Sequence, residues 1–160
     1  MRIANLRIEN FRGVRSGFVQ FGRHPVLVGD NNTGKTTVIE ALTLVLGRDR
    51  LIRELTEHDF FGSNPEAADR IKVVTTVTDF PGDDPEQSSQ WFRDERAVVK
   101  WLDETTGQVH PARGNPAWKL CCQLGVQARF DQESLAVETI RYFHDHDEPI
   151  DPFADEAPAP

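Results

Sequence analysis

The order of hydrophobic and polar positions predicts three short strands near the N-terminus. Residues 2–9 alternate with one step out of phase, residues 10–13 turn the chain, and residues 16–21 alternate again. Residues 25–28, with the sequence Pro-Val-Leu-Val, are apolar and β-branched. This short run is typical of a buried strand. We therefore expect a pair of strands followed by a buried third strand.

The pattern changes to that of a helix at Lys35. From there to Leu46, apolar residues crowd one side of a helical projection, and Gly47 is placed to cap the end. Residues 49–56 are typical of a second helical or irregular piece, and residues 62–65, Gly-Ser-Asn-Pro, break the chain. The predicted third strand and the helix are thus joined by a short loop.

The chain beyond residue 66 is rich in strands. Alternating β-branched and aromatic residues predict strands at residues 71–80, 97–102, 118–130 and 135–143. Loops or turns are predicted at residues 81–85, 103–107 and 131–134, and a short helix at residues 88–96. The acidic residues of the first loop are typical of a solvated turn: Asp83, Asp84 and Glu86. This spacing favours an antiparallel meander.

Composition places the chain among ordinary single domains. It has 160 residues, of which 38% are hydrophobic and 28% charged, enough for one compact unit with a core. No apolar run approaches the roughly 20 residues of a membrane span, and the first residues lack a signal peptide. We expect a cytoplasmic protein with no membrane partner. The adjacent Cys121 and Cys122 suit a reducing compartment, and we expect neither a redox nor a metal role for them.

Charge is unevenly distributed along the chain. Residues 1–53 hold nine Lys or Arg and four Asp or Glu, whereas residues 54–160 hold nine basic and 22 acidic residues. A basic head suits an anion site, and the acidic remainder is typical of a solvated surface. Residues 144–160 combine acid and proline and predict a flexible tail. His144 and His146 alternate there, but solvation is a better interpretation than a designed metal site.

The motif with the clearest chemistry is Gly-x-x-x-x-Gly-Lys-Thr. It occupies the eight residues Gly29, Asp30, Asn31, Asn32, Thr33, Gly34, Lys35 and Thr36. A strand, this loop and a helix in immediate succession define a P-loop, which binds the phosphates of a nucleoside triphosphate. Gly29 and Gly34 permit backbone angles that let the loop point its N–H groups inward. The start of the helix adds attraction for anions.

Each side chain after the second glycine has an expected role. Lys35 should reach the β- and γ-phosphates, and the Thr36 hydroxyl should ligate Mg²⁺. Thr37 can donate a hydrogen bond to a phosphate nearer the sugar. The predicted ligands are therefore a nucleoside triphosphate and Mg²⁺.

Three other residue patterns give weaker signals of function. Residues 98–104 end in two carboxylates, as a Walker B strand does, but Asp-Glu-Thr-Thr-Gly at residues 103–107 favours a hairpin turn. Asp79 and Gly82 match the Asp-x-x-Gly switch of GTPases, although the Asn-Lys-x-Asp base motif is absent from the sequence. Three tryptophans could stack on bases, and core packing is the better interpretation: Trp91, Trp101 and Trp118. A switch-type GTPase therefore stays open as an alternative.

The N-terminal third resembles a known family. Leu-Arg-Ile-Glu-Asn-Phe-Arg at residues 6–12, the loop at residues 28–37 and Ile-Glu-Ala-Leu at residues 39–42 resemble the RecF/SMC-like branch of ABC-type ATPases. Within it, the chain is most similar to the OLD (overcoming lysogenization defect) family of ATP-dependent DNA endonucleases. Residues 57–61, Glu-His-Asp-Phe-Phe, also look family-like. The resemblance implies an α/β fold, the first lobe of a P-loop ABC-type head, followed by an antiparallel β-rich subdomain.

The resemblance also implies ligands and partners. Its cofactors would be ATP and Mg²⁺, with Arg12 near the phosphates and Asn31, Asn32 and Thr33 in the loop around them. Asn32 would lie where two heads close over ATP, which implies a homodimer. DNA would be a partner through the full-length protein.

The implied organisation has three parts. Residues 1–65 would form the nucleotide-binding lobe, residues 66–143 the antiparallel part of the same head, and residues 144–160 the tail. A Leu-Ser-Gly-Gly signature, a switch histidine and a Toprim nuclease domain are not found in the sequence. We therefore expect the N-terminal part of a longer protein, with unknown catalytic residues and little activity alone. A non-enzymatic partner of a full-length ATPase is a further alternative.

Overall fold

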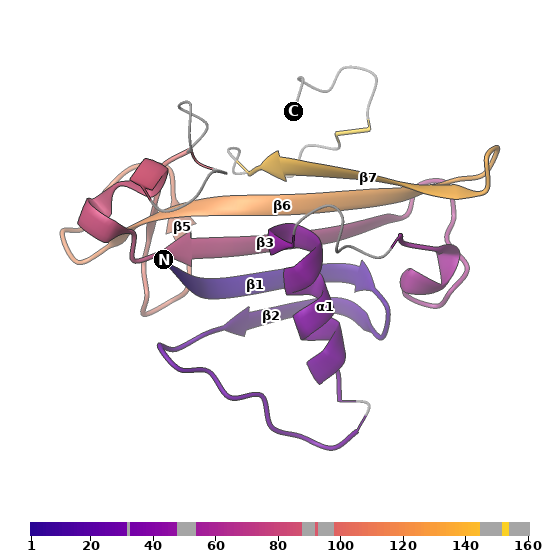
Figure 1. The fold of residues 1–160 in the computed structure, drawn as a ribbon, viewed down its shortest axis with the longest axis horizontal. Helices are drawn as coiled ribbons and strands as arrows, with labels where there is room; N and C mark the ends of the chain where they lie inside the picture. The colour runs from indigo at the N-terminus through magenta and orange to yellow at the C-terminus, as the bar shows by residue number, and fades with distance from the viewer. Residues whose placement is uncertain (32, 48–53, 88–91, 93–97, 145–151, 154–160) are drawn as a thin grey trace.

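Seven strands form one curled antiparallel sheet, and an α-helix covers one face of it (Figure 1). The computed structural model describes residues 1–31, 33–47, 54–87, 92, 98–144 and 152–153. Its elements are β1 (Arg2–Phe11), β2 (Val14–Gln20), α1 (Lys35–Leu46), β3 (Arg70–Thr78), β4 (Lys100–Leu102), β5 (Val109–His110), β6 (Lys119–Asp131) and β7 (Ala136–Phe143). Short 3₁₀ turns lie at Glu57–Asp59, Pro81–Asp83 and Pro85–Gln87.

The strand order is β2-β1-β3-β6-β4-β5, and β7 also pairs with β6. The antiparallel pairing predicted from the spacing is confirmed, but the order is not a simple meander. β6 is long enough to pair with β3 along one edge and with both β4 and β7 along the other. Because β1 pairs with β3, a single sheet runs through both of the predicted parts, residues 1–65 and 66–143.

The step out of phase in β1 is visible in the pairing. The register between β1 and β3 shifts between Ile3 and Asn5, and Ala4, Asn5 and Leu6 are all buried. The register shift leaves Ala4 as the extra residue of β1, while Asn5 is buried on the other face because the hairpin turn at Gly107 covers it. The predicted imperfection is therefore a bulge, and the alternation continues in phase from Leu6 onward.

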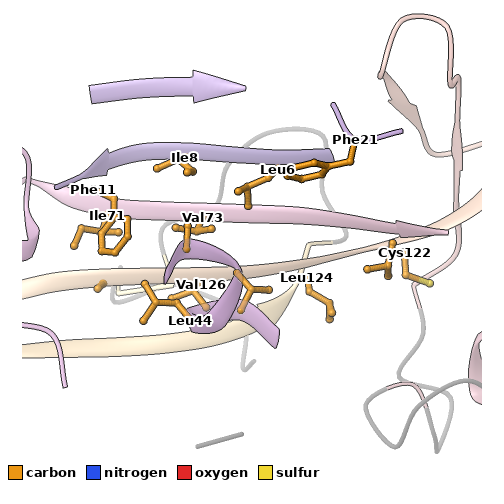
Figure 2. Packing of buried hydrophobic residues seen from close by; sticks show 14 of the residues in the cluster. Leu6, Ile8, Phe11, Phe21, Leu44, Ile71, Val73, Cys122, Leu124 and Val126 are labelled. Atoms are coloured by element: carbon orange, nitrogen blue, oxygen red, sulfur yellow. The ribbon is translucent and has the colours of Figure 1, made fainter. Parts of the chain in front are cut away.

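The core lies between α1 and one face of the sheet. Helix α1 packs against β1, β3 and β6, and its buried residues are mostly three or four positions apart: Thr37, Ala41, Leu44 and Val45. Leu44 of α1 belongs to the same core cluster as Val73 of β3 and Val126 of β6 (Figure 2). This spacing produces the apolar stripe that an α-helix needs to lie on a sheet. The core thus fixes α1, and with it the loop that precedes α1.

One predicted strand is wrong. Residues 25–28 form no strand, and the side chains of Val26 and Val28 are 80% and 87% exposed. A strand is stable only where neighbouring backbone groups accept and donate its hydrogen bonds. The edge strand β2 pairs with β1, and no described strand lies beside residues 25–28. The apolar run therefore remains on the surface immediately before the P-loop.

Smaller differences concern tryptophans and boundaries. Trp101 and Trp118 do not pack in the core as predicted, because both are half-buried and lie outside it. Trp118 instead stacks on His110, with ring centroids 4.1 Å apart. The second strand is Val14–Gln20 rather than residues 16–21, and β4 begins at Lys100. Predictions for residues 49–53, for the short helix apart from Phe92, and for most of the tail lie outside the described residues. Within the described part, no helix has the length and apolar character needed to cross a membrane.

Buried thiols account for the two cysteines. Cys121 and Cys122 have no exposed surface, and burial raises the pKa of each to about 12. A thiol with such a pKa stays protonated near neutral pH and is a poor nucleophile and metal ligand. Their place in β6 is therefore a packing role.

Candidate nucleotide site

The loop before α1 is shaped around the ammonium group of Lys35. The Lys35 Nζ donates to the carbonyl oxygen of Gly29 at 2.6 Å and to that of Asp30, and it lies 3.3 Å from Thr33 Oγ1. The Thr33 hydroxyl donates to the Asp30 carbonyl at 2.8 Å. A positive charge thus lies at the centre of the loop, where a bound phosphate would need it.

Both glycines of the motif are required by the geometry. Gly34 is the N-cap of α1 and has a φ of 87°, in the left-handed region that other residues adopt only with strain. A Cβ on Gly29 would lie 2.8 Å from the Thr33 hydroxyl oxygen, which is too close. Substituting either glycine would therefore open or distort the loop.

The first turn of α1 leaves backbone N–H groups without partners inside the helix. The first hydrogen bond within the helix runs from Val38 N–H to the Gly34 carbonyl, at 3.0 Å. In the described part of the loop and helix, no side chain caps this turn and no acidic residue lies in it. Helix N-termini of this kind attract anions, because the earlier N–H groups have no carbonyl partner in the helix.

The expected site residues fall into three groups. Asn31, Thr33 and Thr36 lie around the loop with exposed or partly exposed side chains, whereas Thr37 is only 9% exposed and belongs to the buried stripe of α1. Asn32 lies outside the described residues. The roles of these residues toward phosphate and Mg²⁺ stay predictions.

Arg12 connects the sheet to the helix that carries the P-loop. It follows β1 with a φ of 52°, and its guanidinium pairs with Glu40 of α1 and, through Nε at 3.0 Å, with Asp59 Oδ1. The Arg12 backbone N–H also donates to the Asp59 carbonyl at 2.7 Å. Arg12 therefore holds three distant segments in one place.

Asp59 is the buried anchor of this cluster. Its side chain is 3% exposed, and its second oxygen accepts from the Thr56 backbone N–H at 2.9 Å. A carboxylate this deep costs several kcal/mol unless it is paired and hydrogen-bonded, which Arg12 and Thr56 provide. Phe60 then forms a bridge with Phe11. The turn at residues 57–59 is thus fastened to the end of β1.

Glu40 and Asp59 are functional candidates that sequence reasoning missed. Three of the segments quoted for the family resemblance, residues 6–12, 39–42 and 57–61, meet at Arg12, Glu40 and Asp59. The signal was present as an acidic residue in each of the two later segments. What the sequence did not show is that both carboxylates face the same arginine.

The carboxylates considered for a GTPase switch or a Walker B strand make contacts outside the P-loop. Asp79 accepts from Arg2 Nε at 2.8 Å and Lys119 Nζ at 3.0 Å, and the hydrogen bond from Arg2 lowers its pKa. Asp103 accepts from the Thr105 N–H and closes the β4–β5 hairpin, which confirms the predicted turn. Glu104 pairs with Arg2 and Lys119. The three carboxylates that could serve as the GTPase switch or as Walker B acids are therefore already bound to other groups.

The Gly-x-x-x-x-Gly-Lys-Thr motif thus forms a loop around the Lys35 ammonium group, followed by an uncapped helix start. The family model described as the AAA ATPase domain matches residues 1–108, and the chain belongs to this family. The family assigns an ATP-binding domain of the ATPase type, whereas the motif alone predicted a nucleoside triphosphate. A search of curated proteins finds no match to the chain.

Proposed function

We propose that the P-loop binds ATP with Mg²⁺, and that the chain is the ATP-binding part of an ATP-dependent DNA endonuclease similar to the OLD family. The observation that carries the nucleotide proposal is the Lys35 ammonium group held among the carbonyls of Gly29 and Asp30. Those carbonyls are weak partners for a full positive charge compared with phosphate oxygens. The phosphate oxygens of ATP would therefore replace these carbonyls as partners of Lys35 with little loss of free energy.

The donor set also suits Mg²⁺. Thr36 lies in the first turn of α1, next to Lys35, and its side chain is not buried. Mg²⁺ keeps several waters and needs only one or two protein oxygens when phosphates supply the rest. Thr36 would hold the ion against the β- and γ-phosphates, where the ion neutralises negative charge. Among the described residues, no group of three or more His, Cys, Asp or Glu offers a competing metal cage.

Arg12 would act on this site through the helix. Its guanidinium binds Glu40, five residues after Lys35 on α1, and this contact fixes the position of the helix start relative to β1. Arg12 is thus a positioning residue for the P-loop in addition to the phosphate contact that the resemblance implies. A shift of α1 would displace Lys35 and Thr36 together.

The proposed ATP-driven dimer has a candidate surface. Val26, Leu27 and Val28 are exposed and lead directly into the P-loop. Exposed apolar runs beside polar groups mark interaction sites. A second copy that closed over ATP would cover this segment. The DNA and nuclease parts of the proposal rest on the resemblance at residues 6–12, 28–37 and 39–42.

Calorimetry with ATP and Mg²⁺ tests the nucleotide proposal. Lys35→Ala should lower the affinity by at least about tenfold, because the charge-assisted hydrogen bonds to phosphate are removed. Lys119→Ala is the matched control, since Lys119 lies in a separate ion-pair cluster with Asp79. Equal affinity of Lys35→Ala and wild type would refute the proposal. Tighter binding of GTP than of ATP would favour the GTPase alternative.

A further inference from the structure

The sheet face opposite α1 contains a hollow. Along β1, β3 and β6, side chains that alternate with the core residues point to this face, among them Arg7, Lys72 and Gln123. The hollow has a volume of about 640 Å³. That is within the range of roughly 300–1,000 Å³ typical of ligand pockets. It lies on the other side of the sheet from the P-loop helix, so it is a separate site.

The β4–β5 hairpin closes one end of the hollow. Asn5 Nδ2 donates to the Gly107 carbonyl at 3.1 Å, and Gln20 Nε2 donates to the Glu104 carbonyl at 2.5 Å. These bonds join the hairpin turn to β1 and β2. The hairpin itself starts at the edge of β6, where β4 pairs, so it reaches over this face of the sheet. Gly107 packs so closely that a Cβ there would lie 3.0 Å from the Phe18 ring. The wall is therefore fixed in place.

The charge of the hollow is opposite to that of the whole chain. Its lining includes three permanent cations, Arg7, Lys72 and Lys100, and one carboxylate, Glu9. The chain as a whole has a formal net charge of -8. Lys100 is only 3% exposed and donates to Gln123 Oε1 at 3.2 Å. Arg7 is exposed and Lys72 half-buried, so these two cations, rather than the buried Lys100, are the ones that a ligand can reach.

Aromatic rings lie beside these cations. The Tyr142 ring lies over Gly125, where a Cβ would be 2.5 Å from the ring, so the glycine makes room for a flat ring on the sheet. Phe18 is 48% exposed, and the Arg7 guanidinium lies 5.8 Å from its ring centre. His110 lines the hollow and stacks on Trp118 behind it. Flat rings next to cations match the two needs of a nucleotide, a base to stack and a phosphate to pair.

We propose that this hollow binds single-stranded DNA, with phosphates at Arg7 and Lys72 and bases against Phe18 and Tyr142. A nucleic-acid strand is favoured because the hollow brings two reachable cations, Arg7 and Lys72, beside two rings, Phe18 and Tyr142. Beyond the hollow, Arg70 lies two residues before Lys72 on β3, about 7 Å away, but it donates to the carbonyls of Ala67 and Asp69, and its neighbour Arg129 forms an ion pair with Glu138. Single-strand sites combine cations with stacking rings in this way. The choice of DNA as the polymer rests on the proposed function.

The test measures fluorescence anisotropy of a labelled oligo-dT strand at low salt. The Lys35→Ala variant is the background, so that the P-loop does not contribute. Adding Arg7→Gln and Lys72→Gln should weaken binding about tenfold or more and reduce the salt slope by about 0.7 for each phosphate that is no longer neutralised. Tyr142→Leu should weaken binding with the salt slope unchanged, because it removes stacking and no charge. Arg23→Gln, an exposed arginine outside the hollow, is the matched control.

Four outcomes would overturn the proposal. They are no binding of the strand, equal weakening in the Arg23→Gln control, dTMP binding as tightly as the strand, and a duplex binding as tightly as the strand. Circular dichroism of each variant ensures that a missing signal does not reflect unfolding. ATP calorimetry on the chain with an intact Lys35 is independent of this result. Failure of the hollow would thus leave the P-loop proposal standing, and failure of the P-loop would leave the hollow testable.

Discussion

Two ion-pair clusters lie at opposite ends of β1, and each contains an arginine. Arg12 follows the end of β1 and pairs with Glu40 and Asp59, whereas Arg2 begins β1 and pairs with Asp79 and Glu104. The chemistry is the same, but only the first cluster includes a residue of the P-loop helix. The contrast shows that similar ion pairs serve different purposes according to which segments they join.

The two clusters also differ in burial. The acidic side chains differ most, with Asp59 3% and Asp79 31% exposed, whereas the arginines differ the other way, with Arg12 27% and Arg2 16% exposed. Solvent weakens an exposed pair, while a buried carboxylate that loses its partner keeps its full desolvation cost. The Arg12 cluster should therefore matter more for stability, and it alone should matter for nucleotide binding.

The largest expected effect is that of removing Arg12. Arg12→Gln leaves Asp59 buried with one fewer partner and should lower the free energy of unfolding by about 3 kcal/mol. Arg2→Gln should cost less than Arg12→Gln, because Asp79 is partly exposed and keeps its ion pair with Lys119. Urea denaturation of both variants, followed by circular dichroism, measures the difference. Equal losses of stability would show that burial of Asp59 does not separate the clusters.

The same pair of variants separates stability from function. At a temperature where both are folded, Arg12→Gln should bind ATP more weakly than wild type, and Arg2→Gln should bind it equally well. If Arg2→Gln weakens ATP binding as much as Arg12→Gln does, the first cluster has no special link to the P-loop.

The next largest effect should come from Thr36. Thr36→Ala should reduce ATP affinity about tenfold when Mg²⁺ is present and much less when EDTA is added, since the hydroxyl acts on the ion. Thr43→Ala is the matched control, because Thr43 is an exposed threonine of the same helix that donates to the Ile39 carbonyl. A reduction of the same size with and without Mg²⁺ would contradict this role.

A smaller effect concerns pH and the Arg2 cluster. Hydrogen bonds from Arg2 and then Lys119 hold the pKa of Asp79 below its ordinary value of 3.8. The resulting stability is fully present above 3.8 and is lost as the pH falls through the lower pKa of the folded state. Asp79→Asn should therefore reduce the Tm at pH 7 and flatten its decline in acid. A decline as steep as that of wild type would assign the acid sensitivity to other carboxylates.

The smallest effect on stability should be at Val26. Its side chain is 80% exposed, so Val26→Ser should leave the Tm within about 1 °C of wild type. Sedimentation with ATP and Mg²⁺ should nevertheless show less dimer than wild type, because an apolar contact between copies is removed. Unchanged self-association would exclude this segment from the proposed interface.

Local features could be predicted from the sequence. The P-loop glycines, the helix that starts at Lys35 and the turn at residues 103–107 each depend on residues close together in the chain. The bulge of β1 was visible as a single step out of phase. Periodicity and turn chemistry are sufficient for such elements.

Features that depend on distant partners could not be predicted. Residues 25–28 have the composition of a buried strand, but burial requires a neighbour that the sequence pattern does not specify. Arg12 and Asp59 are 47 positions apart and meet only because β1 and the turn at residues 57–59 are paired. The position of β4 and β7 along one edge of β6 depends on long-range pairing in the same way.

Hydrogen–deuterium exchange with and without ATP and Mg²⁺ tests the central claim most directly, because it locates the ligand. Peptides covering residues 29–38 should become protected when ATP is added, and Lys35→Ala should abolish that protection. Peptides on the opposite face, such as residues 104–110 of the β4–β5 hairpin, should change little. Protection confined to that face, or ATP binding with no change at residues 29–38, would contradict the assignment of the P-loop as the nucleotide site.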